Sequence, residues 1–229
     1  MNEILNGFIH AIQLIISLDP EIIKITILTL EVSIASTFLA VIIAIPLANV
    51  IHFKKFKGKK SLINIIQTFY SMPTVLVGLL VFLLLSRSGP FGWLGLLFTP
   101  TGIVIGQTIL ILPIIIGLTI SSLKSVGNEI KDLSLSLGAS SFQMVLTIMK
   151  EAKYALFSAI ILGFGRAISE VGVAMMIGGN IRGYTRVITT TMSLETQKGN
   201  IEFSIALGII LLTIALLINI LLNFFQNRK

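Results

Sequence analysis

The sequence predicts an all-α fold, a polytopic membrane helical bundle of about five transmembrane helices preceded by an N-terminal interfacial helix. Composition is the first observation behind this prediction. Of the 229 residues, 55% are hydrophobic and only 12% are charged, with a mean hydropathy of +0.98, whereas soluble domains are about 25% charged. The second is a series of apolar runs that reach the roughly 20 residues a helix needs to cross a bilayer. We expect a single transmembrane domain over residues 1–229.

The N-terminal segment, residues 4–18, is too short to span, and its polar residues recur every three or four positions. This periodicity predicts one polar stripe on an apolar helix, which is typical of a helix lying in the membrane surface. A signal peptide is the rejected alternative, because the segment has no basic start and no small-residue cleavage site. His10 belongs to the polar stripe, so we interpret it as a solvated side chain and not as a metal ligand.

The first two spans are expected at residues 22–51 and 62–85. The densest positive cluster of the chain separates them, and it consists of Lys54, Lys55, Lys57, Lys59 and Lys60. Lysine accumulates on the cytoplasmic side of membrane proteins, so this lysine loop is expected inside. Residues 86–100, rich in Gly and Pro, then form an external loop with Trp93 as an interface anchor.

The third span is expected at residues 101–123. Residues 142–178 are too long for one crossing and carry three charged residues at the start, so we place the fourth span from Tyr154 onward. Residues 179–200 are then an external loop, and the fifth span covers residues 203–225.

The basic residues favour this orientation. Eleven lie on the predicted cytoplasmic side, five lie outside, and Arg166 lies within the membrane, which accounts for all 17. The net charge of +7 therefore reports topology and does not indicate a nucleic-acid partner. Because the chain has no cysteine, disulfides, thiolate metal sites and cysteine nucleophiles are excluded.

The predicted cytoplasmic loop at residues 124–153 contains signals for two short helices. Asn128 is expected to cap the first helix, and Gly138 to end it in the left-handed conformation. Ser140 or Ser141 then caps the next helix. Two acidic residues, Glu129 and Asp132, place negative charge at the positive end of the first helix dipole.

Three apolar residues of the first short helix, Ile130, Leu133 and Leu137, are expected to form one exposed ridge. An apolar ridge on a cytoplasmic loop is typical of a surface that binds a partner. The alternative is a surface helix with no special role.

The loop resembles the signature loop of the membrane subunits of ATP-binding-cassette (ABC) importers. The resemblance rests on Asp132, Leu133, Ser134 and Gly138, followed ten residues later by Ile148. Leu133 and Ser134 stand where that family has two alanines, and Lys150-Glu151 replaces its usual Leu-Pro. The resemblance implies that this loop is a coupling helix that docks on an ATPase subunit. The residues it assigns to coupling are Glu129, Ile130, Asp132, Leu133, Leu137, Gly138 and Ala139.

A charged motif lies halfway along the fourth span and contains Arg166, Ser169, Glu170 and Gly172. Each intramembrane charge costs roughly 2.5–3.5 kcal/mol on insertion scales, so these charges need partners or water. Arg166 and Glu170 are four residues apart and can pair along the helix. Two interpretations stay open: a structural ion pair, or a polar translocation path in which Arg166 offers a positive site to an anion.

Glu31 is the other intramembrane carboxylate, and it either pairs with a basic group across the bundle or lies near the outer interface. Three glycines of the fourth span, Gly163, Gly165 and Gly172, are interpreted as close-packing positions between helices.

Residues 163–199, from the charged motif through Thr-Thr-Thr-Met-Ser-Leu-Glu-Thr-Gln-Lys-Gly, are similar to permeases of tungstate, molybdate and sulfate importers, and most similar to the tungstate branch. The resemblance implies a type I ABC importer permease fold in the cytoplasmic membrane. It also implies a homodimer, a cytoplasmic ATPase dimer and an extracytoplasmic substrate-binding protein. Tungstate is the expected substrate, with molybdate or sulfate as the alternative.

The chain has no Gly-x-x-x-x-Gly-Lys-Ser/Thr phosphate loop, so it is not expected to bind ATP or to be an enzyme. We expect no cofactor and no metal, because the two histidines, His10 and His52, lie outside the spans. Nucleic acid is not an expected partner, whereas membrane lipid is. An ATP-independent secondary transporter is the rival class, although no internal repeat supports it.

Overall fold

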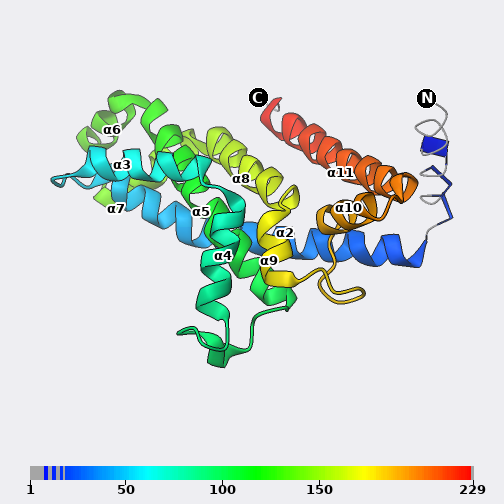
Figure 1. Cartoon of the computed structure of the whole chain (residues 1–229). Coiled ribbons are helices and arrows are strands. Elements are labelled where there is room, and N and C mark those ends of the chain that lie inside the picture. Colours follow the sequence, from blue (N-terminus) through cyan, green and yellow to red (C-terminus); the bar gives the residue numbers. More distant parts are fainter. Residues whose placement is uncertain (1–7, 10–11, 14–15, 18, 228–229) are drawn as a thin grey trace.

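The computed structural model describes residues 8–9, 12–13, 16–17 and 19–227, and side chains up to residue 220. Every regular element in these residues is a helix, which confirms the all-α prediction (Figure 1). The interfacial helix expected at residues 4–18 lies largely outside the described residues.

Three described helices are long and apolar enough to cross a membrane: α2 (Pro20–Phe53), α5 (Pro100–Ser125) and α11 (Ile201–Asn227). Two helix pairs pass the same test when each is taken as one bent span: α3 with α4 (Lys59–Thr68, Thr74–Leu85) and α8 with α9 (Lys153–Ile168, Gly172–Gly178). The described part of the chain therefore offers up to five spans, in agreement with the sequence prediction.

Local sequence determines where α2 and α5 begin. Asp19 caps α2, since its carboxylate accepts hydrogen bonds from the N–H groups of Glu21 (2.8 Å) and Ile22 (3.2 Å). The Thr99 hydroxyl accepts from the Gly102 N–H (3.1 Å) at the start of α5. Both helices have proline at the first position, where its missing N–H costs nothing.

The centre of the subunit is the packing of α2 along α5. Ala40, Ala44 and Ala48 recur every four residues on one face of α2 and are fully buried. They contact large branched residues of α5, among them Ile111 and Ile115. Small residues let two helix backbones approach closely, which is how membrane helices pack without a hydrophobic driving force between them.

The second span, expected at residues 62–85, is a bent pair of helices and not a single helix. A short 3-10 helix (Phe69–Ser71) follows α3, and the chain then bends by 101° into α4. Pro73 causes this break, because it has no N–H to donate and it drives Met72 into an extended conformation (φ −63°, ψ 130°).

The predicted external loop at residues 179–200 also differs, because it contains helix α10 (Ile188–Gln197). Four consecutive residues of α10 are buried, and these are Ile188, Thr189, Thr190 and Thr191. This helix packs against α11 and α2, so much of the segment belongs to the folded bundle.

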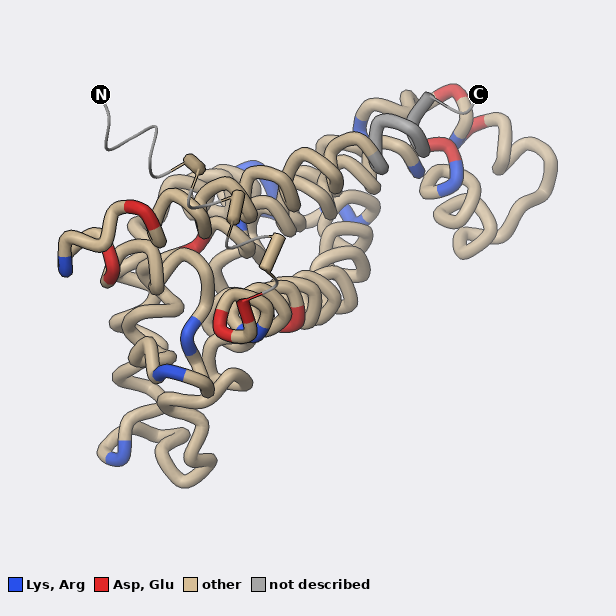
Figure 2. The backbone as a smooth tube through the Cα atoms, turned by 90° about the vertical axis from the view of Figure 1, so that its right-hand side faces the viewer, with Lys and Arg blue, Asp and Glu red and all other residues tan. Residues whose placement is uncertain are grey.

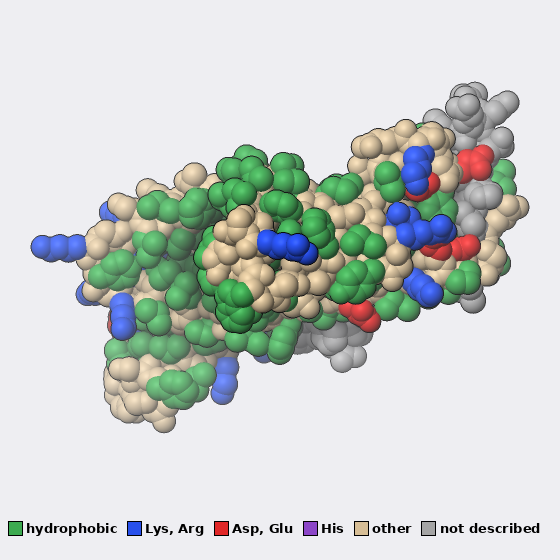
Figure 3. Space-filling model, turned by 60° about the horizontal axis from the view of Figure 1, so that its bottom comes forward, with side chains coloured by type: hydrophobic (Ala, Val, Ile, Leu, Met, Phe, Trp, Pro, Cys, Tyr) green, Lys and Arg blue, Asp and Glu red, His purple; other side chains and the backbone are tan. Residues whose placement is uncertain are grey.

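Charged residues gather toward the two ends of the folded chain, with long uncharged stretches between them (Figure 2). In the space-filling view, hydrophobic side chains cover much of the middle of the face (Figure 3). Basic side chains lie at one end of this face, a mixed acidic and basic group lies at the other, and one basic side chain stands in the middle. Such an apolar belt between two charged ends is the surface that a bilayer requires.

Candidate coupling and translocation sites

The predicted coupling loop folds as two short helices with a tight corner. Helix α6 (Gly127–Ser136) ends just before Gly138, whose φ of +81° confirms the predicted left-handed conformation. The Ala139 N–H donates to the Ser134 carbonyl (3.0 Å), and the Gly138 N–H donates to the Leu135 carbonyl (3.0 Å). This double hydrogen bond is the Schellman arrangement, which satisfies the last carbonyls of a helix.

Of the two helix caps expected in this loop, one is present and one is not. Ser140 caps α7 (Ser141–Glu151) in a reciprocal capping box with Gln143, as one of the two alternatives expected. The cap expected at Asn128 is wrong, because α6 follows α5 through Gly127 at φ +77°, and Asn128 already lies in its first turn. Glu129 is in that turn, and Asp132 is exposed one turn later.

The apolar ridge is only partly as predicted. Leu133 and Leu137 are 59% and 78% exposed, and Phe142 on α7 is exposed beside the corner. Ile130 instead packs against the buried cluster that contains Leu123. Ile130 therefore holds α6 against the subunit, while Leu133, Leu137 and Phe142 form an exposed surface, which we call the corner surface.

The fourth span is not the continuous helix that residues 154–178 predicted. It breaks between α8 and α9 with a bend of 56°, at Ser169-Glu170-Val171. Side chains from three parts of the chain satisfy the freed backbone groups. The Glu170 carboxylate accepts from the Val173 N–H (3.1 Å), Gln107 donates to the Ala167 carbonyl (3.1 Å), and the Thr189 hydroxyl donates to the Glu170 carbonyl (2.7 Å). A broken membrane helix requires such internal partners.

The predicted ion pair is present at this break. Arg166 Nη1 lies 2.8 Å from Glu170 Oε2, and the Glu170 side chain is 1% exposed whereas that of Arg166 is 33% exposed. Glu170 thus uses one oxygen for Arg166 and the other for the first turn of α9. The Ser169 hydroxyl donates back to the Gly165 carbonyl (2.8 Å), and Ser169 itself is exposed.

A groove of ≈460 Å³ lies between α8 and α11, and Arg166, Ser169 and Asn219 are its polar lining residues. Gly165 also lines it, and a Cβ there would meet nothing within 4 Å, so the close-packing expectation is wrong for Gly165 within one subunit. The groove therefore brings together two of the four candidate path residues.

The other candidate residues lie elsewhere. Glu170 is buried behind Arg166, and Gly172 packs against α4, where a Cβ would lie 2.7 Å from Thr74 Oγ1. A Cβ at Gly163 would likewise lie 2.7 Å from Ile115 side-chain atoms, which agrees with the packing expectation for these two glycines.

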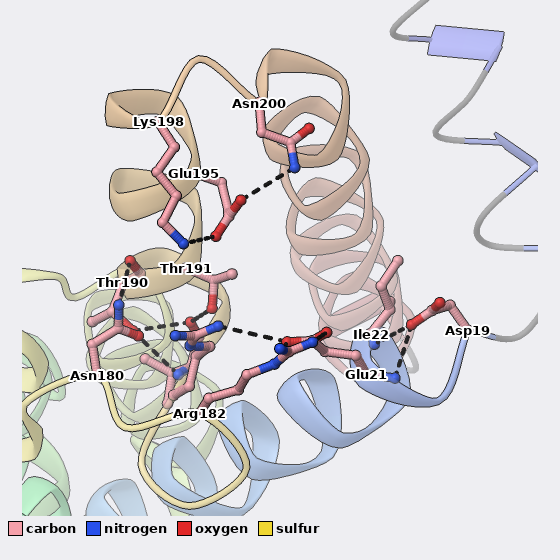
Figure 4. A network of polar contacts seen from close by, with 12 residues as sticks. Asp19, Glu21, Ile22, Asn180, Arg182, Thr190, Thr191, Glu195, Lys198 and Asn200 are labelled. Carbon is pink, nitrogen blue, oxygen red and sulfur yellow. Dashed lines mark hydrogen bonds and ion pairs between the residues drawn. The ribbon is translucent and has the colours of Figure 1, made fainter.

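A charge network that the sequence did not predict lies at the predicted outer end. Arg182 donates twice to Glu21, from Nε (2.9 Å) and from Nη2 (2.6 Å), and Arg186 lies 3.5 Å from the same carboxylate (Figure 4). This hydrogen bond to Glu21 raises the pKa of Arg182 above its usual value. A cavity of ≈480 Å³ beside the network is lined by Lys24 and Glu31 as well, so Glu31 faces the same cavity as the network.

A second pair extends the network toward α11. Lys198 donates to Glu195 (2.9 Å), and Asn200 donates to its other oxygen (3.1 Å) (Figure 4). The hydrogen bond from Lys198 lowers the pKa of Glu195. Basic and acidic side chains of α2, the 179–187 segment and α10 thus meet around a further hollow of ≈330 Å³.

Residues 36–229 match the protein family described as the inner membrane component of binding-protein-dependent transport systems. The chain belongs to this family. It is accordingly a multi-pass protein of the inner membrane, as the composition and the resemblance predicted.

Two relatives show the range of similarity. The chain is 40% identical over 228 residues to the tungstate uptake system permease protein TupB of Peptoclostridium acidaminophilum, covering 100% of both chains. It is 26% identical over 210 residues to the molybdenum transport system permease protein ModB of Haemophilus influenzae, covering 88% of this chain and 92% of that one. The resemblance stated from the sequence is thereby confirmed.

Solved structures confirm the fold. The chain matches a methionine ABC transporter, MetNI, with a TM-score of 0.73 at 14% identity, covering 90% of this chain and 94% of that one. It matches an ABC transporter involved in alginate import with a TM-score of 0.76 at 20% identity, covering 96% and 83%. At these identities the likeness shows the type I importer permease fold alone.

Proposed function

We propose that the chain is the permease subunit of an ATP-driven, binding-protein-dependent importer of an oxyanion, and that the oxyanion is tungstate. The observation that carries this proposal is the 40% identity over the whole chain to a tungstate uptake permease. A second tungstate uptake permease, from Campylobacter jejuni, is also 40% identical over 219 residues, covering 96% of this chain and 92% of that one. The molybdenum permease at 26% identity is a more distant relative.

The permease acts as a homodimer, with an ATPase dimer on the cytoplasmic side and a substrate-binding protein outside. The corner surface supports the ATPase contact, because Leu133, Leu137 and Phe142 are exposed on a rigid corner that no described part of the subunit covers. An isolated apolar surface of this kind is stabilised when a soluble partner covers it. Gly138 and Ala139 shape that corner through their hydrogen bonds to the end of α6, and Glu129 and Asp132 add exposed carboxylates along the same helix.

The groove between α8 and α11 is the candidate wall of the translocation path. Arg166 and Ser169 give it polar groups within an otherwise apolar lining. Glu170 neutralises Arg166 and holds its guanidinium in place, one-third exposed. An oxyanion therefore meets a cation that is already paired, and this pairing favours passage of the anion over tight binding. Glu170 and Gly172 contribute to the path by fixing the break and by packing α9 on α4.

The chain itself is not the ATPase and needs no cofactor, in keeping with the missing phosphate loop. Hydrolysis therefore occurs in the partner subunit. This distinguishes the proposal from the ATP-independent secondary transporter.

The test is reconstitution of the permease in liposomes with and without the ATPase subunit and the tungstate-loaded binding protein. We expect ATP-dependent tungstate uptake only in the complete system, with lower uptake when the binding protein is loaded with molybdate or offered sulfate. Oxyanion flux through the permease alone, without ATP, would instead support the secondary transporter. Equal uptake of molybdate would remove tungstate as the specific substrate while leaving the importer assignment intact.

A further inference from the structure

A basic cavity of ≈390 Å³ lies at the predicted cytoplasmic end of the subunit, between the ends of α2 and α5, the start of α6 and the lysine loop. Its lining includes four lysines, and these are Lys55, Lys59, Lys124 and Lys131. Phe53, Leu123 and Ile148 give it an apolar component, and no aspartate or glutamate lines it. The cavity is far from the charged motif of the fourth span in sequence, and neither the coupling role nor the translocation path uses it.

These ammonium groups have no acidic partner in the part of the chain that the structure describes. The Lys59 ammonium donates to the backbone carbonyls of His52 and Lys54, which ties the lysine loop to the end of α2. No carboxylate lies within ion-pair distance of any of the four lining lysines among the described residues. Four like charges around one hollow repel one another, so an anion in the hollow would relieve that repulsion.

The start of α6 adds to the same electrostatic field. Gly127 and Asn128, in the first turn, line the cavity, and no side chain caps the N–H groups of this turn. Unsatisfied N–H groups at a helix start carry partial positive charge and bind phosphate oxygens well when cations are beside them.

We propose that this cavity binds the phosphate group of an anionic inner-leaflet phospholipid. Its position favours a lipid source, because α2 and α5 are membrane spans and the cavity lies where both of them end. Basic pockets between transmembrane helices on the cytoplasmic side are suited to lipid headgroups. The lining provides both chemistries that a phospholipid presents, cations for the phosphate and apolar side chains for the glycerol and first acyl carbons. Phe56, exposed between two lysines of the loop, is available for the acyl chains.

A bound headgroup would link elements that otherwise have few common contacts. Lys55 and Lys59 come from the lysine loop and the start of α3, Lys124 from α5, and Lys131 from α6. The phosphate therefore holds the base of α6 against the membrane ends of α2 and α5, and the corner surface at the far end of α6 is presented in a defined orientation. The inference rests on the membrane placement and does not depend on tungstate as the substrate.

The test uses the purified full-length chain and native mass spectrometry, with phosphatidylglycerol or phosphatidylcholine titrated into the detergent solution. The test variant is Lys124→Gln/Lys131→Gln. The matched control is Lys57→Gln/Lys60→Gln, which removes the same charge from the same face at positions that do not line the cavity. A lysine that faces a bound headgroup contributes about fivefold to binding, so we expect about 25-fold weaker phosphatidylglycerol binding in the test variant. The control should lose much less, because Lys57 and Lys60 do not line the cavity and add only to the general positive field.

Two further measurements separate the sources of an anion. Thermal unfolding of the chain in phosphatidylcholine nanodiscs is followed with added inorganic phosphate or tungstate, and binding of the ATPase subunit to both variants is measured in the same nanodiscs. The proposal expects no stabilisation by the free anions at concentrations where phosphatidylglycerol nanodiscs stabilise the chain. Stabilisation by free phosphate that Lys124→Gln/Lys131→Gln abolishes would overturn the lipid source. Equal binding of both lipids, or equal loss in the two variants, would overturn the site. If the test variant loses only ATPase binding, the cavity is part of the protein interface.

Discussion

The ion pair at the break in the fourth span leads to an asymmetric prediction. Arg166→Ala leaves the Glu170 carboxylate, 1% exposed, without its cationic partner, whereas Glu170→Gln leaves an arginine that is one-third exposed and can reach water or headgroups. Removing one partner of a buried pair costs about 3–5 kcal/mol. We expect that range for Arg166→Ala and less than half of it for Glu170→Gln, because glutamine still accepts from the Val173 N–H. Arg166→Ala/Glu170→Gln removes both charges and should recover most of the loss.

The assay is thermal unfolding of each purified variant in one detergent, followed by tungstate uptake in the complete importer. At about 2–4 °C per kcal/mol for a chain of this size, Arg166→Ala should lower Tm by roughly 10 °C, and the double variant by only a few degrees. Arg87→Ala is the control for the loss of one arginine, because Arg87 is exposed in the loop after α4. A double variant as unstable as Arg166→Ala would show that the loss does not come from an unpaired Glu170 carboxylate. Stable variants that transport only when Arg166 is present would show a path role in addition to the structural one.

Three other changes test separate parts of the structure. Gly138→Val forces a β-branched residue into φ +81°, at a cost of about 1–2 kcal/mol, and should reduce co-purification of the ATPase subunit. Gly138→Asn tolerates this conformation and should not reduce it. Equal co-purification with the two variants would contradict the prediction. Gly172→Val puts side-chain atoms against Thr74 and should destabilise the folded chain by about 1–3 kcal/mol. Gly165→Ala should not, and equal Tm values for these two variants would count against close packing of α4 on α9. Because Lys198 lowers the pKa of Glu195, their pair stabilises above the usual glutamate pKa of about 4.3 and is lost as pH falls through the lowered value. With Lys198 54% exposed, Lys198→Gln should cost about 0.2–1 kcal/mol at pH 7, and the difference in Tm from wild type should shrink as the pH falls below the usual glutamate value; a difference that does not change with pH would contradict this prediction.

The sequence was sufficient for features that depend on composition or on a few neighbouring residues. Spans are recognisable because the bilayer thickness imposes their length and excludes charge. The corner at Gly138 was predictable because glycine and the Ser140 cap act within one turn. Asn128 does not cap the helix for an equally local reason. Gly127 already turns the chain, so the helix starts at Gly127, two residues before the start that an Asn128 cap implies.

Features that depend on distant residues could not be predicted. Glu21 and Arg182 are 161 residues apart, and only the folded bundle shows that they pair. The bend at Pro73 had a local signal, a proline within an apolar run, but length and hydropathy alone gave one continuous span. The basic cavity combines lysines from three parts of the chain, of which the sequence indicated only the lysine loop.

The charged motif illustrates why an intramembrane charge has more than one possible reason to be there. A soluble helix that breaks can leave its free backbone groups to water, but at membrane depth every such group needs a partner from the protein. Glu170 meets that need directly at the Val173 N–H, and Gln107 and Thr189 meet it from α5 and α10. Once Glu170 is required at the break, a cation beside it is required too, and Arg166 supplies it at 2.8 Å. The carboxylate is therefore explained by the backbone. Only the exposed third of Arg166, with Ser169 in the same groove, is left to interact with a passing anion, and a substitution that separates the two roles has to keep the pair neutral.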